Sequence, residues 1–312
     1  MEEPEERDGF MEQFSCALVS ELRCQLGEGP VWDERENTLY WLDSFSKLWL
    51  RMKPDGKMSR FSAPSCVGTL ALRRDGGLVL GLEDGIYLSE SENQSLRLLS
   101  NPEQGMIGNR FNDGKPGPCG RLYIGTMSTA NNDGSGNAAA SGALYMVSTD
   151  GRWQKLLSEV GISNGMAWNR EQNTFYYADS PTRCVFAFDY DKKSGLLANC
   201  RVAVKLPEGD GIPDGLTIDG NDHLWIAQWG GWCVSHYDPT TGKLLGKISV
   251  PAEHVTSCCF GGKNLDTLFI TTAATGLDAQ QLKKQPQAGM LFAAKPGVHG
   301  LPPYRFGGAG DG

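Results

Sequence analysis

Three oxygen-bearing side chains occupy equivalent places in three similar stretches of the sequence. Glu28, Asn164 and Asp214 each come directly before a glycine, 10 or 11 residues ahead of an apolar strand. Two carboxylates and an amide oxygen are hard ligands, which suit Ca²⁺, Mg²⁺ or Mn²⁺ better than a tightly held structural Zn²⁺. Three protein ligands would leave positions open for water and substrate, as at a catalytic metal. The joint pattern predicts a shared metal site, although turn formation explains each Asn or Asp equally well on its own.

The stretches that must position these residues recur along the chain. Each unit has a turn-rich lead, an apolar strand, a polar turn and a second strand, and forty glycines indicate many such tight turns. The second strands are expected to begin near Leu39, Leu78, Leu122, Phe175, Leu224 and Leu268. Their spacing of 39 to 53 residues is typical of four-stranded propeller blades. We therefore expect an all-β fold, a six-bladed β-propeller with a metal site in its central channel.

The remaining segments complete this expectation. One propeller domain should span residues 14–307, after a disordered acidic lead-in (1–13) and before a flexible tail (308–312). The strand at residues 15–20 should complete the last blade, because an open ring would leave an exposed sheet edge. Residues 128–141 should form a loop over one mouth of the ring, and residues 278–284 about one helical turn.

An offset of 9 to 11 residues, applied to all six units, collects one polar residue from each. These residues are Glu28, Thr69, Asn112, Asn164, Asp214 and Ser257. Blades surround a central channel, so these side chains are expected to converge at one end of it. Arg110 lies two residues before Asn112 and could hold a hydroxyl or carboxylate of a ligand by two hydrogen bonds. A surface salt bridge is an equally open role for this guanidinium.

Composition excludes several classes of function. The net charge is −8 with no basic cluster, so a nucleic-acid partner is not expected. No apolar run approaches the roughly 18 residues of a membrane span. Residues 1–10 do not resemble a signal peptide, and nine scattered cysteines suggest reduced thiols, so we expect a cytoplasmic monomer. The four histidines show no mutual spacing typical of a metal site or a triad.

Several motifs resemble a known family. Residues 26–32 (LGEGPVW), 110–115 (RFNDGK) and 162–168 (ISNGMAW) are similar to the senescence-marker-protein/gluconolactonase/luciferin-regenerating-enzyme family. Residues 186–191 (FAFDYD), 212–215 (IPDG) and 256–264 (TSCCFGGKN) narrow the resemblance to its animal regucalcin branch. The similarity runs from about residue 22 to residue 307.

The resemblance implies a fold, a metal and a reaction. Members are six-bladed propellers that hold one divalent cation, Ca²⁺, Zn²⁺, Mg²⁺ or Mn²⁺, and the family's ligands fall here on Glu28, Asn164 and Asp214. Arg110 and Asn112 would contact the substrate, a sugar lactone such as glucono-1,5-lactone. We expect hydrolysis by a metal-activated water, with Asp214 as the catalytic general base.

One segment departs from the regucalcin pattern and keeps other functions open. Thr129 and Ala130 stand where the branch carries acidic residues, and Asn131 or Asp133 could substitute. One alternative is a calcium-binding or regulatory protein with little catalysis. Another is a hydrolase of the luciferin-regenerating or organophosphate type, which an apolar channel mouth would favour over a polar one. Candidate residues for that mouth are Met106, Trp229 and Trp232.

Overall fold

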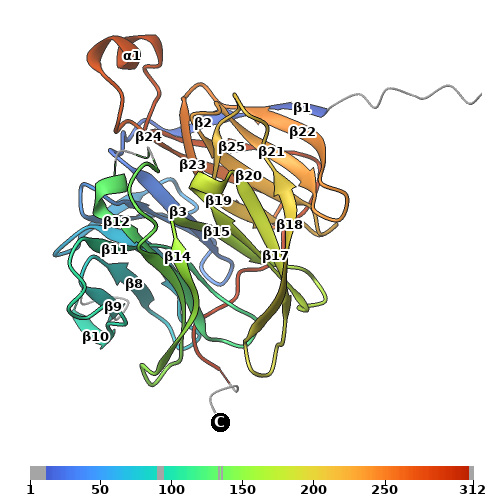
Figure 1. The fold of residues 1–312 in the computed structure, drawn as a ribbon. Coiled ribbons are helices and arrows are strands. Elements are labelled where there is room, and N and C mark those ends of the chain that lie inside the picture. The colour runs from blue at the N-terminus through green and yellow to red at the C-terminus, as the bar shows by residue number, and fades with distance from the viewer. Residues whose placement is uncertain (1–11, 90–94, 133, 135, 309–312) are drawn as a thin grey trace, which may run out of the picture.

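The protein is built almost entirely from β-strands, as the ribbon in Figure 1 shows. The computed structural model describes residues 12–89, 95–132, 134 and 136–308 of the 312. Short apolar runs between turn-forming residues account for the strands. For example, β4 is buried along its whole length and follows a turn in which Asn37 has a φ of 49°. The lead-in and tail expected at the termini lie largely outside the described residues, and those predictions stay predictions.

Four sheets contain four strands each, in chain order and with antiparallel neighbours. A compact meander of this kind arises when each strand pairs with the next through a short turn. The first two sheets are β3 (Gly27–Asp33), β4 (Thr38–Asp43), β5 (Leu48–Met52) and β6 (Met58–Ser62), then β7 (Val67–Leu72), β8 (Leu78–Leu82), β9 (Gly85–Ser89) and β10 (Leu96–Ser100). The next two are β11 (Asn109–Pro116), β12 (Leu122–Ser128), β13 (Gly142–Val147) and β14 (Trp153–Val160), then β15 (Ser163–Trp168), β16 (Thr174–Asp179), β17 (Cys184–Tyr190) and β18 (Leu197–Lys205).

A fifth sheet of nine strands joins the two ends of the chain. Its strands are β1 (Glu12–Ser15), β2 (Ala17–Ser20), β19 (Ile212–Ile218), β20 (Leu224–Trp229), β21 (Cys233–Asp238), β22 (Lys243–Ser249), β23 (His254–Gly261), β24 (Thr267–Ala273) and β25 (Leu291–Ala294). β2 pairs antiparallel with β25, beside which it lies in Figure 1, so the N-terminal strand completes the last group as predicted. A single residue pair, Trp229 with His254, connects β20 to β23.

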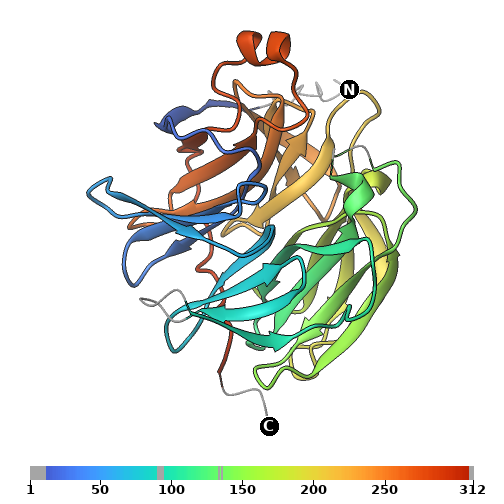
Figure 2. The same ribbon diagram turned by 90° about the vertical axis from the view of Figure 1, so that its left-hand side faces the viewer.

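The second strands of the repeated units are confirmed to within one residue. β4, β8, β12, β16, β20 and β24 begin at or one residue before the predicted positions. The predicted helical turn is α1 (Ala279–Lys284), which begins with a capping box between Asp278 and Gln281 and projects from the sheets in Figures 1 and 2. Two short 3₁₀ helices are η1 (Thr129–Asn131) and η2 (Ser180–Thr182). Among the described residues, no helix combines the length and apolar character needed to span a bilayer.

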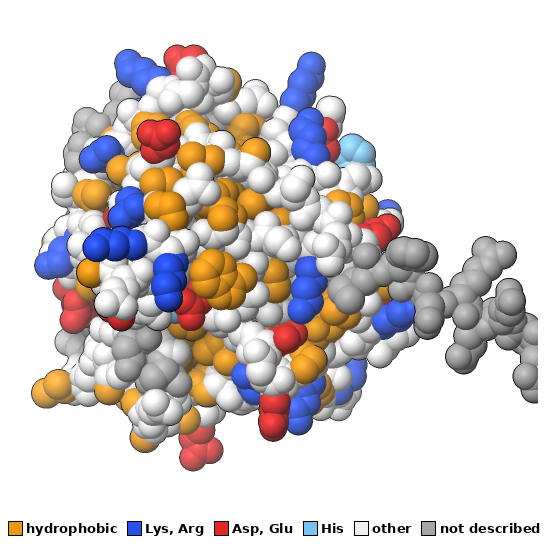
Figure 3. All heavy atoms as spheres, turned by 90° about the horizontal axis from the view of Figure 1, so that it is seen from above, with side chains coloured by type: hydrophobic (Ala, Val, Ile, Leu, Met, Phe, Trp, Pro, Cys, Tyr) orange, Lys and Arg blue, Asp and Glu red, His pale blue; other side chains and the backbone are white. Residues whose placement is uncertain are grey.

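The core lies between neighbouring sheets. Tyr40 and Trp49 of the first sheet pack with Leu80 of the second, and Ile86 of the second packs with Ile124 of the third. Burial of one such aliphatic side chain contributes roughly 1.5–3 kcal/mol to stability. All nine cysteines are free and five are buried, as predicted for most of them; their reduced state stays a prediction. On the face shown in Figure 3, positive and negative side chains are interspersed.

The first strand of each repeated unit lies innermost. These inner strands are β3, β7, β11, β15, β19 and β23, and each contacts the next in this order. β23 in turn contacts β3, so the series closes on itself. The six predicted polar residues each lie on one inner strand, and the closed order brings them toward a common axis.

Candidate functional site

Every inner strand has an irregularity where its predicted polar residue lies. The pairing register with the second strand shifts at or beside Glu28, Thr69, Asn112, Asn164, Asp214 and Ser257. An irregularity of this kind bends the strand and re-aims its side chains. The side chains of these six residues therefore do not follow the regular alternation of a paired strand.

Two glycines allow the inner strands to approach each other closely at this level. A Cβ on Gly165 would lie 2.5 Å from the backbone nitrogen of Leu216 on the next inner strand. A Cβ on Gly215 would overlap the Ser257 hydroxyl of the strand after that. Asn164 and Asp214 each directly precede one of these glycines. The candidate metal ligands therefore lie where the inner strands approach each other closely, which only a residue without a side chain allows.

One cavity brings together all five predicted site residues. Its volume of about 40 Å³ can hold an ion or a few water molecules. Eight of its lining residues carry polar side chains: Glu28, Arg110, Asn112, Asn131, Asn132, Asn164, Ser180 and Asp214. The apolar part of the wall consists of Leu26, Met127, Ile162, Ile212 and Trp229. The roles assigned to the five residues remain predictions, but their convergence is a structural fact.

Hydrogen bonds hold the Asn164 amide in one orientation. Its Nδ2 donates to the Ser180 hydroxyl at 2.8 Å, and its Oδ1 accepts from Nδ2 of Asn112 at 3.1 Å. Asn112 also donates to the Ser163 carbonyl oxygen at 2.8 Å. The amide oxygen of Asn164 therefore faces the cavity side, where a cation would need it.

Two acidic groups in the cavity, Glu28 and Asp214, have raised pKa values because they are buried and lie near other negative charges. Burial raises the pKa of Glu28 to about 8, and the charge of Asp113 adds to this rise. Burial likewise raises the pKa of Asp214 well above its usual range, with further contributions from Glu28 and Asp113. Each shift reports the cost of a second negative charge in a poorly solvated place.

Arg110 is the cation nearest these acids. Its side chain is buried, and burial lowers the pKa of the guanidinium although the nearby acids favour its charged form. Nε donates to Oδ1 of Asn132 and Nη1 to Oδ1 of Asn112, both at 2.7 Å. The alternative of a surface salt bridge is therefore wrong, since this group is buried and bonded to neutral amides. Among the described residues these bonds engage Nε and Nη1, which leaves Nη2 for a ligand.

The donor set fits a hard divalent cation. Two carboxylates and a fixed amide oxygen face one small cavity, and oxygen atoms are the ligands that Ca²⁺ and Mg²⁺ prefer. The local charge also fits, because a bound cation would offset the burial and the repulsion that together raise both carboxyl pKa values. The ammonium group of Lys115 donates to the Leu216 carbonyl oxygen at 2.6 Å.

Some predicted residues lie elsewhere. Thr69 donates its hydroxyl to the Asn112 carbonyl oxygen and so braces the neighbouring strand. Ser257 lines a second cavity, which the C-terminal residues 301–304 cover. Trp229 does line the site and stacks on His254 at 4.0 Å, whereas Met106 and Trp232 are exposed and lie outside its lining.

The loop at residues 128–141 reaches the site, as expected. Asn131 is buried in the cavity wall, and Asn132 holds Arg110. Asp133, one of the two suggested substitutes for the acidic residues, lies outside the described residues. Asn132 and Ser180 are not among the site residues predicted from the sequence. Ser180 directly follows the second strand β16, so the start of each unit's second turn is the signal that would have located it.

The inner-strand site and the β-sheet architecture define the class of protein. The chain matches the SMP-30/Gluconolactonase/LRE-like region over residues 26–274, and it belongs to this family. Among curated relatives, "Putative sugar lactone lactonase YvrE" of Bacillus subtilis is 39% identical over 296 residues, covering 95% of this chain and 99% of the relative. Human regucalcin is 37% identical over 303 residues, covering 95% and 99%.

Solved structures show the same fold. A calcium-binding protein, regucalcin from Agrobacterium tumefaciens, superposes with a TM-score of 0.89 at 27% identity, covering 95% of this chain and 99% of that one. A luciferin-regenerating enzyme gives a TM-score of 0.87 at 30% identity, covering 93% and 98%. The fold is therefore that of the regucalcin-type propellers.

Proposed function

We propose that this protein is a divalent-metal-dependent lactonase that opens a sugar lactone of the glucono-1,5-lactone type. The observation that carries the proposal is the convergence of Glu28, Arg110, Asn112, Asn164 and Asp214 on one cavity. Membership of a gluconolactonase-containing family gives it independent support. The eight polar side chains of the lining offer hydrogen bonds to the hydroxyl groups of a polyol.

The proposal includes the architecture that carries the site. Dividing the nine-stranded sheet at its single Trp229–His254 pair leaves β19–β22 with β1 as one group and β23–β25 with β2 as another. Together with the four separate sheets this makes six units around the inner strands, a six-bladed propeller. The free thiols fit a reducing compartment, and we take the protein to be a cytoplasmic monomer. Light scattering of the purified chain would test the monomer.

Glu28, Asn164 and Asp214 would hold the cation. Such an ion, whether Ca²⁺, Zn²⁺, Mg²⁺ or Mn²⁺, polarises a carbonyl group and stabilises negative charge on its oxygen. The amide of Asn164 is already fixed for this task by Ser180 and Asn112. The carboxylates supply the negative charge that a hard cation requires.

The chain's own residues supply the rest of the reaction. The Asp214 carboxylate takes a proton from the water whose oxygen attacks the lactone carbonyl carbon. The ring C–O bond then breaks, the proton passes to the departing alkoxide, and the product is an open hydroxy acid. Nη2 of Arg110 and the Asn112 amide bind the hydroxyl groups of the sugar and orient the carbonyl toward Asp214.

Lactone hydrolysis by the full chain after chelator treatment tests this function. Activity toward glucono-1,5-lactone should be absent, and each divalent cation added in turn should be ranked by the turnover it restores. Restored turnover supports the lactonase. Measurable cation binding with no turnover for any ion would contradict it and would favour a calcium-binding role, like that stated for the Agrobacterium relative.

A second candidate rests on the apolar part of the cavity wall. Trp229, Met127 and two isoleucines could accept an aromatic or alkyl group, so a lactone or phosphate ester with such a group is the alternative substrate. Assaying an aryl phosphotriester beside the sugar lactone separates the two. A higher kcat/KM for the phosphotriester would replace the sugar lactone as the substrate class.

A further inference from the structure

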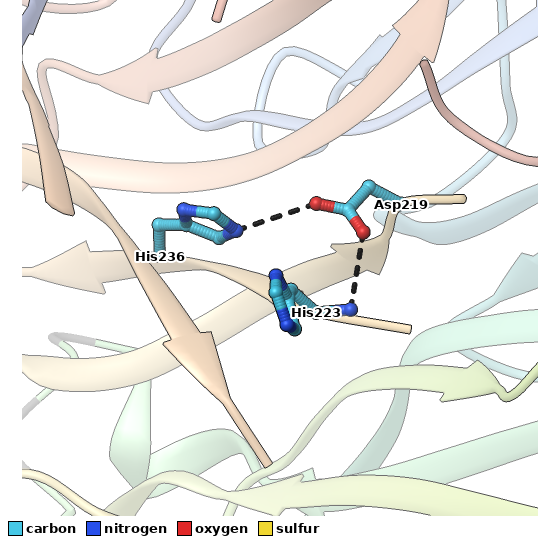
Figure 4. A group of neighbouring side chains, drawn as sticks. All are labelled: Asp219, His223 and His236. Atoms are coloured by element: carbon cyan, nitrogen blue, oxygen red, sulfur yellow. Dashed lines mark hydrogen bonds and ion pairs between the residues drawn. The ribbon is translucent and has the colours of Figure 1, made fainter. Parts of the chain in front are cut away.

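A second group of metal-ligating side chains lies away from the cavity. Asp219 follows β19, His223 precedes β20, and His236 lies in the middle of β21. We call these residues the imidazole cluster. One ligand atom from each lies within 4.8 Å of the others, and Figure 4 shows the three side chains converging. Sheet pairing brings them together, because Trp225 is the register partner of His236 and His223 lies two residues earlier.

His236 is buried without a hydrogen-bond partner. Its side chain is 6% exposed, and neither ring nitrogen has such a partner among the described residues. Nε2 lies 3.3 Å from Oδ2 of Asp219, which is near enough for an ion pair when the ring is protonated, but the geometry is not that of a hydrogen bond. Buried polar atoms that lack a partner are rare and costly, so this ring is poised for a ligand.

The surrounding contacts hold the cluster in place. Oδ1 of Asp219 accepts the backbone N–H groups of Asn221 at 2.8 Å and His223 at 3.1 Å. Oδ2 accepts the indole N–H of Trp225 at 2.9 Å. The Trp225 ring stacks on His236 with 4.0 Å between ring centroids. The carboxylate and one imidazole are thus oriented before any ion binds, which is what a metal site requires of its supporting residues.

We propose that Asp219, His223 and His236 bind a borderline transition-metal ion of the Zn²⁺ class. Two neutral imidazoles and one carboxylate are a common zinc donor set, with water as the fourth ligand. Ligands about 2.0–2.1 Å from a tetrahedral ion lie roughly 3.4 Å apart. Closing the present separations therefore needs a shift of little more than an ångström, which the partly exposed His223 can supply.

The site is independent of the proposed lactonase site. Asp219 follows the end of β19 and Asp214 lies near its beginning, five residues earlier. An extended strand rises about 3.3 Å per residue, so the backbone places their Cα atoms up to roughly 16 Å apart along β19. The ligand chemistry differs as well, because imidazoles select zinc-like ions whereas the cavity offers only oxygen atoms.

Zn²⁺ binding to the full chain tests the proposal. The background is Glu28→Gln/Asp214→Asn, which removes the two cavity carboxylates, with folding checked by circular dichroism. Calorimetric titration with Zn²⁺ alone should show one site per chain. Adding His236→Gln should weaken it at least about tenfold, because even residues that only support a ligand cost that much when replaced. His299→Gln is the control, since His299 is exposed and contacts the Asn264 carbonyl oxygen.

A spectroscopic readout excludes a merely structural role for the histidines. Co²⁺ bound to the background protein should give the intense visible bands of a four-coordinate ion, and both His223→Gln and His236→Gln should abolish them. If the background variant fails to fold, the wild-type chain with excess Ca²⁺ replaces it. Zn²⁺ stoichiometry and Co²⁺ bands unchanged by either substitution would overturn the proposal.

Discussion

The two candidate cation sites lie at opposite ends of β19 and are assembled in different ways. The carboxylate site, Glu28, Asn164 and Asp214, takes its ligands from three inner strands that are far apart in sequence. The imidazole cluster takes all of its ligands from residues 219–236: Asp219 and His223 lie in the turn between β19 and β20, and His236 lies on β21 of the same sheet. The first site therefore exists only when the inner strands have closed on each other. The second needs only the pairing of β19, β20 and β21.

This difference explains why repetition in the sequence indicates one site and not the other. A site built at equivalent positions of repeated units leaves the same trace in each unit, here an oxygen-bearing residue before a glycine. A site built within one unit leaves no such trace. The substitutions below are meant to separate the two sites by experiment.

The largest effect is expected from Asp214→Asn. The variant loses both a cation ligand and the proposed base, so lactone turnover should fall by at least about 10³-fold even with excess cation. Steady-state hydrolysis of glucono-1,5-lactone measures this loss. Zn²⁺ binding at the imidazole cluster should stay unchanged, and so should the turnover of Glu208→Gln, an exposed acid used as control. Near-normal turnover would disprove the assignment of Asp214.

Arg110→Lys should have the next largest effect. A lysine cannot donate to Asn112 and Asn132 while also binding substrate, as the planar guanidinium can. We expect kcat/KM to fall by about 100-fold, mainly through KM, because one or two charged hydrogen bonds are lost. An unchanged KM with a reduced kcat would show instead that Arg110 acts in the transition state. The imidazole cluster should be unaffected.

The pH dependence of cation binding should distinguish the two sites. Glu28 has a pKa of about 8 in the ion-free protein, so Ca²⁺ affinity should fall by up to about tenfold for each pH unit below that value. At Asp219, burial acts to raise the carboxyl pKa, but His236, Trp225 and two backbone N–H groups outweigh it and lower the pKa. Protonation of Asp219 should therefore not reduce the Zn²⁺ affinity of the imidazole cluster when the pH falls from 8.5 to 7.0. Titrations at pH 7.0 and 8.5 test both statements.

The raised pKa of Glu28 also predicts how the free energy of unfolding changes with pH. Glu28 binds its proton more tightly in the folded chain than at its ordinary pKa of 4.5, so the folded state holds more protons between about pH 4.5 and 8. The free energy of unfolding of the ion-free protein should therefore fall as the pH rises through this range. Thermal melting with and without Ca²⁺ checks the sign. A midpoint that rises with pH in the absence of Ca²⁺ would contradict it.

The smallest effect is expected from Asn132→Ala. The Asn132 amide oxygen accepts one hydrogen bond from Nε of Arg110, and its loss should reduce kcat/KM by about fivefold. Thr129→Ala in the same loop is the matched control, because the Thr129 hydroxyl donates to the Gly108 carbonyl oxygen and not to Arg110. Equal effects of the two substitutions would mean that the loop as a whole, and not this bond, positions Arg110.

Much of the fold could be predicted from the sequence because its units repeat. The second strands were located to within one residue, since apolar runs such as that of β8 (LVLGL) lie between clear turns. The pairing of β2 with β25 followed from the need to cover a sheet edge. The convergence of the five site residues followed from placing equivalent residues on equivalent strands.

The remaining features depend on contacts that repetition does not encode. The partners Asn132 and Ser180 lie in turns, where side-chain direction depends on the local backbone. Spacing along the sequence does not reveal that His223 and His236 lie close together, because the β20–β21 register and not sequence distance brings them together. The two missing acids of the loop could be read from the sequence, but the bond from Arg110 to Asn132 could not.

The pairing of β2 with β25 has a consequence for the order of synthesis. Residues 17–20 are synthesised long before their partners, residues 291–294. A growing chain can form its internal meanders one after another, but β2 lacks its partner strand until residues 291–294 have been made. Pairing of β2 with β25 is thus a late step of folding, and a fusion placed just before residue 12 would be attached close to the strand that completes the last group.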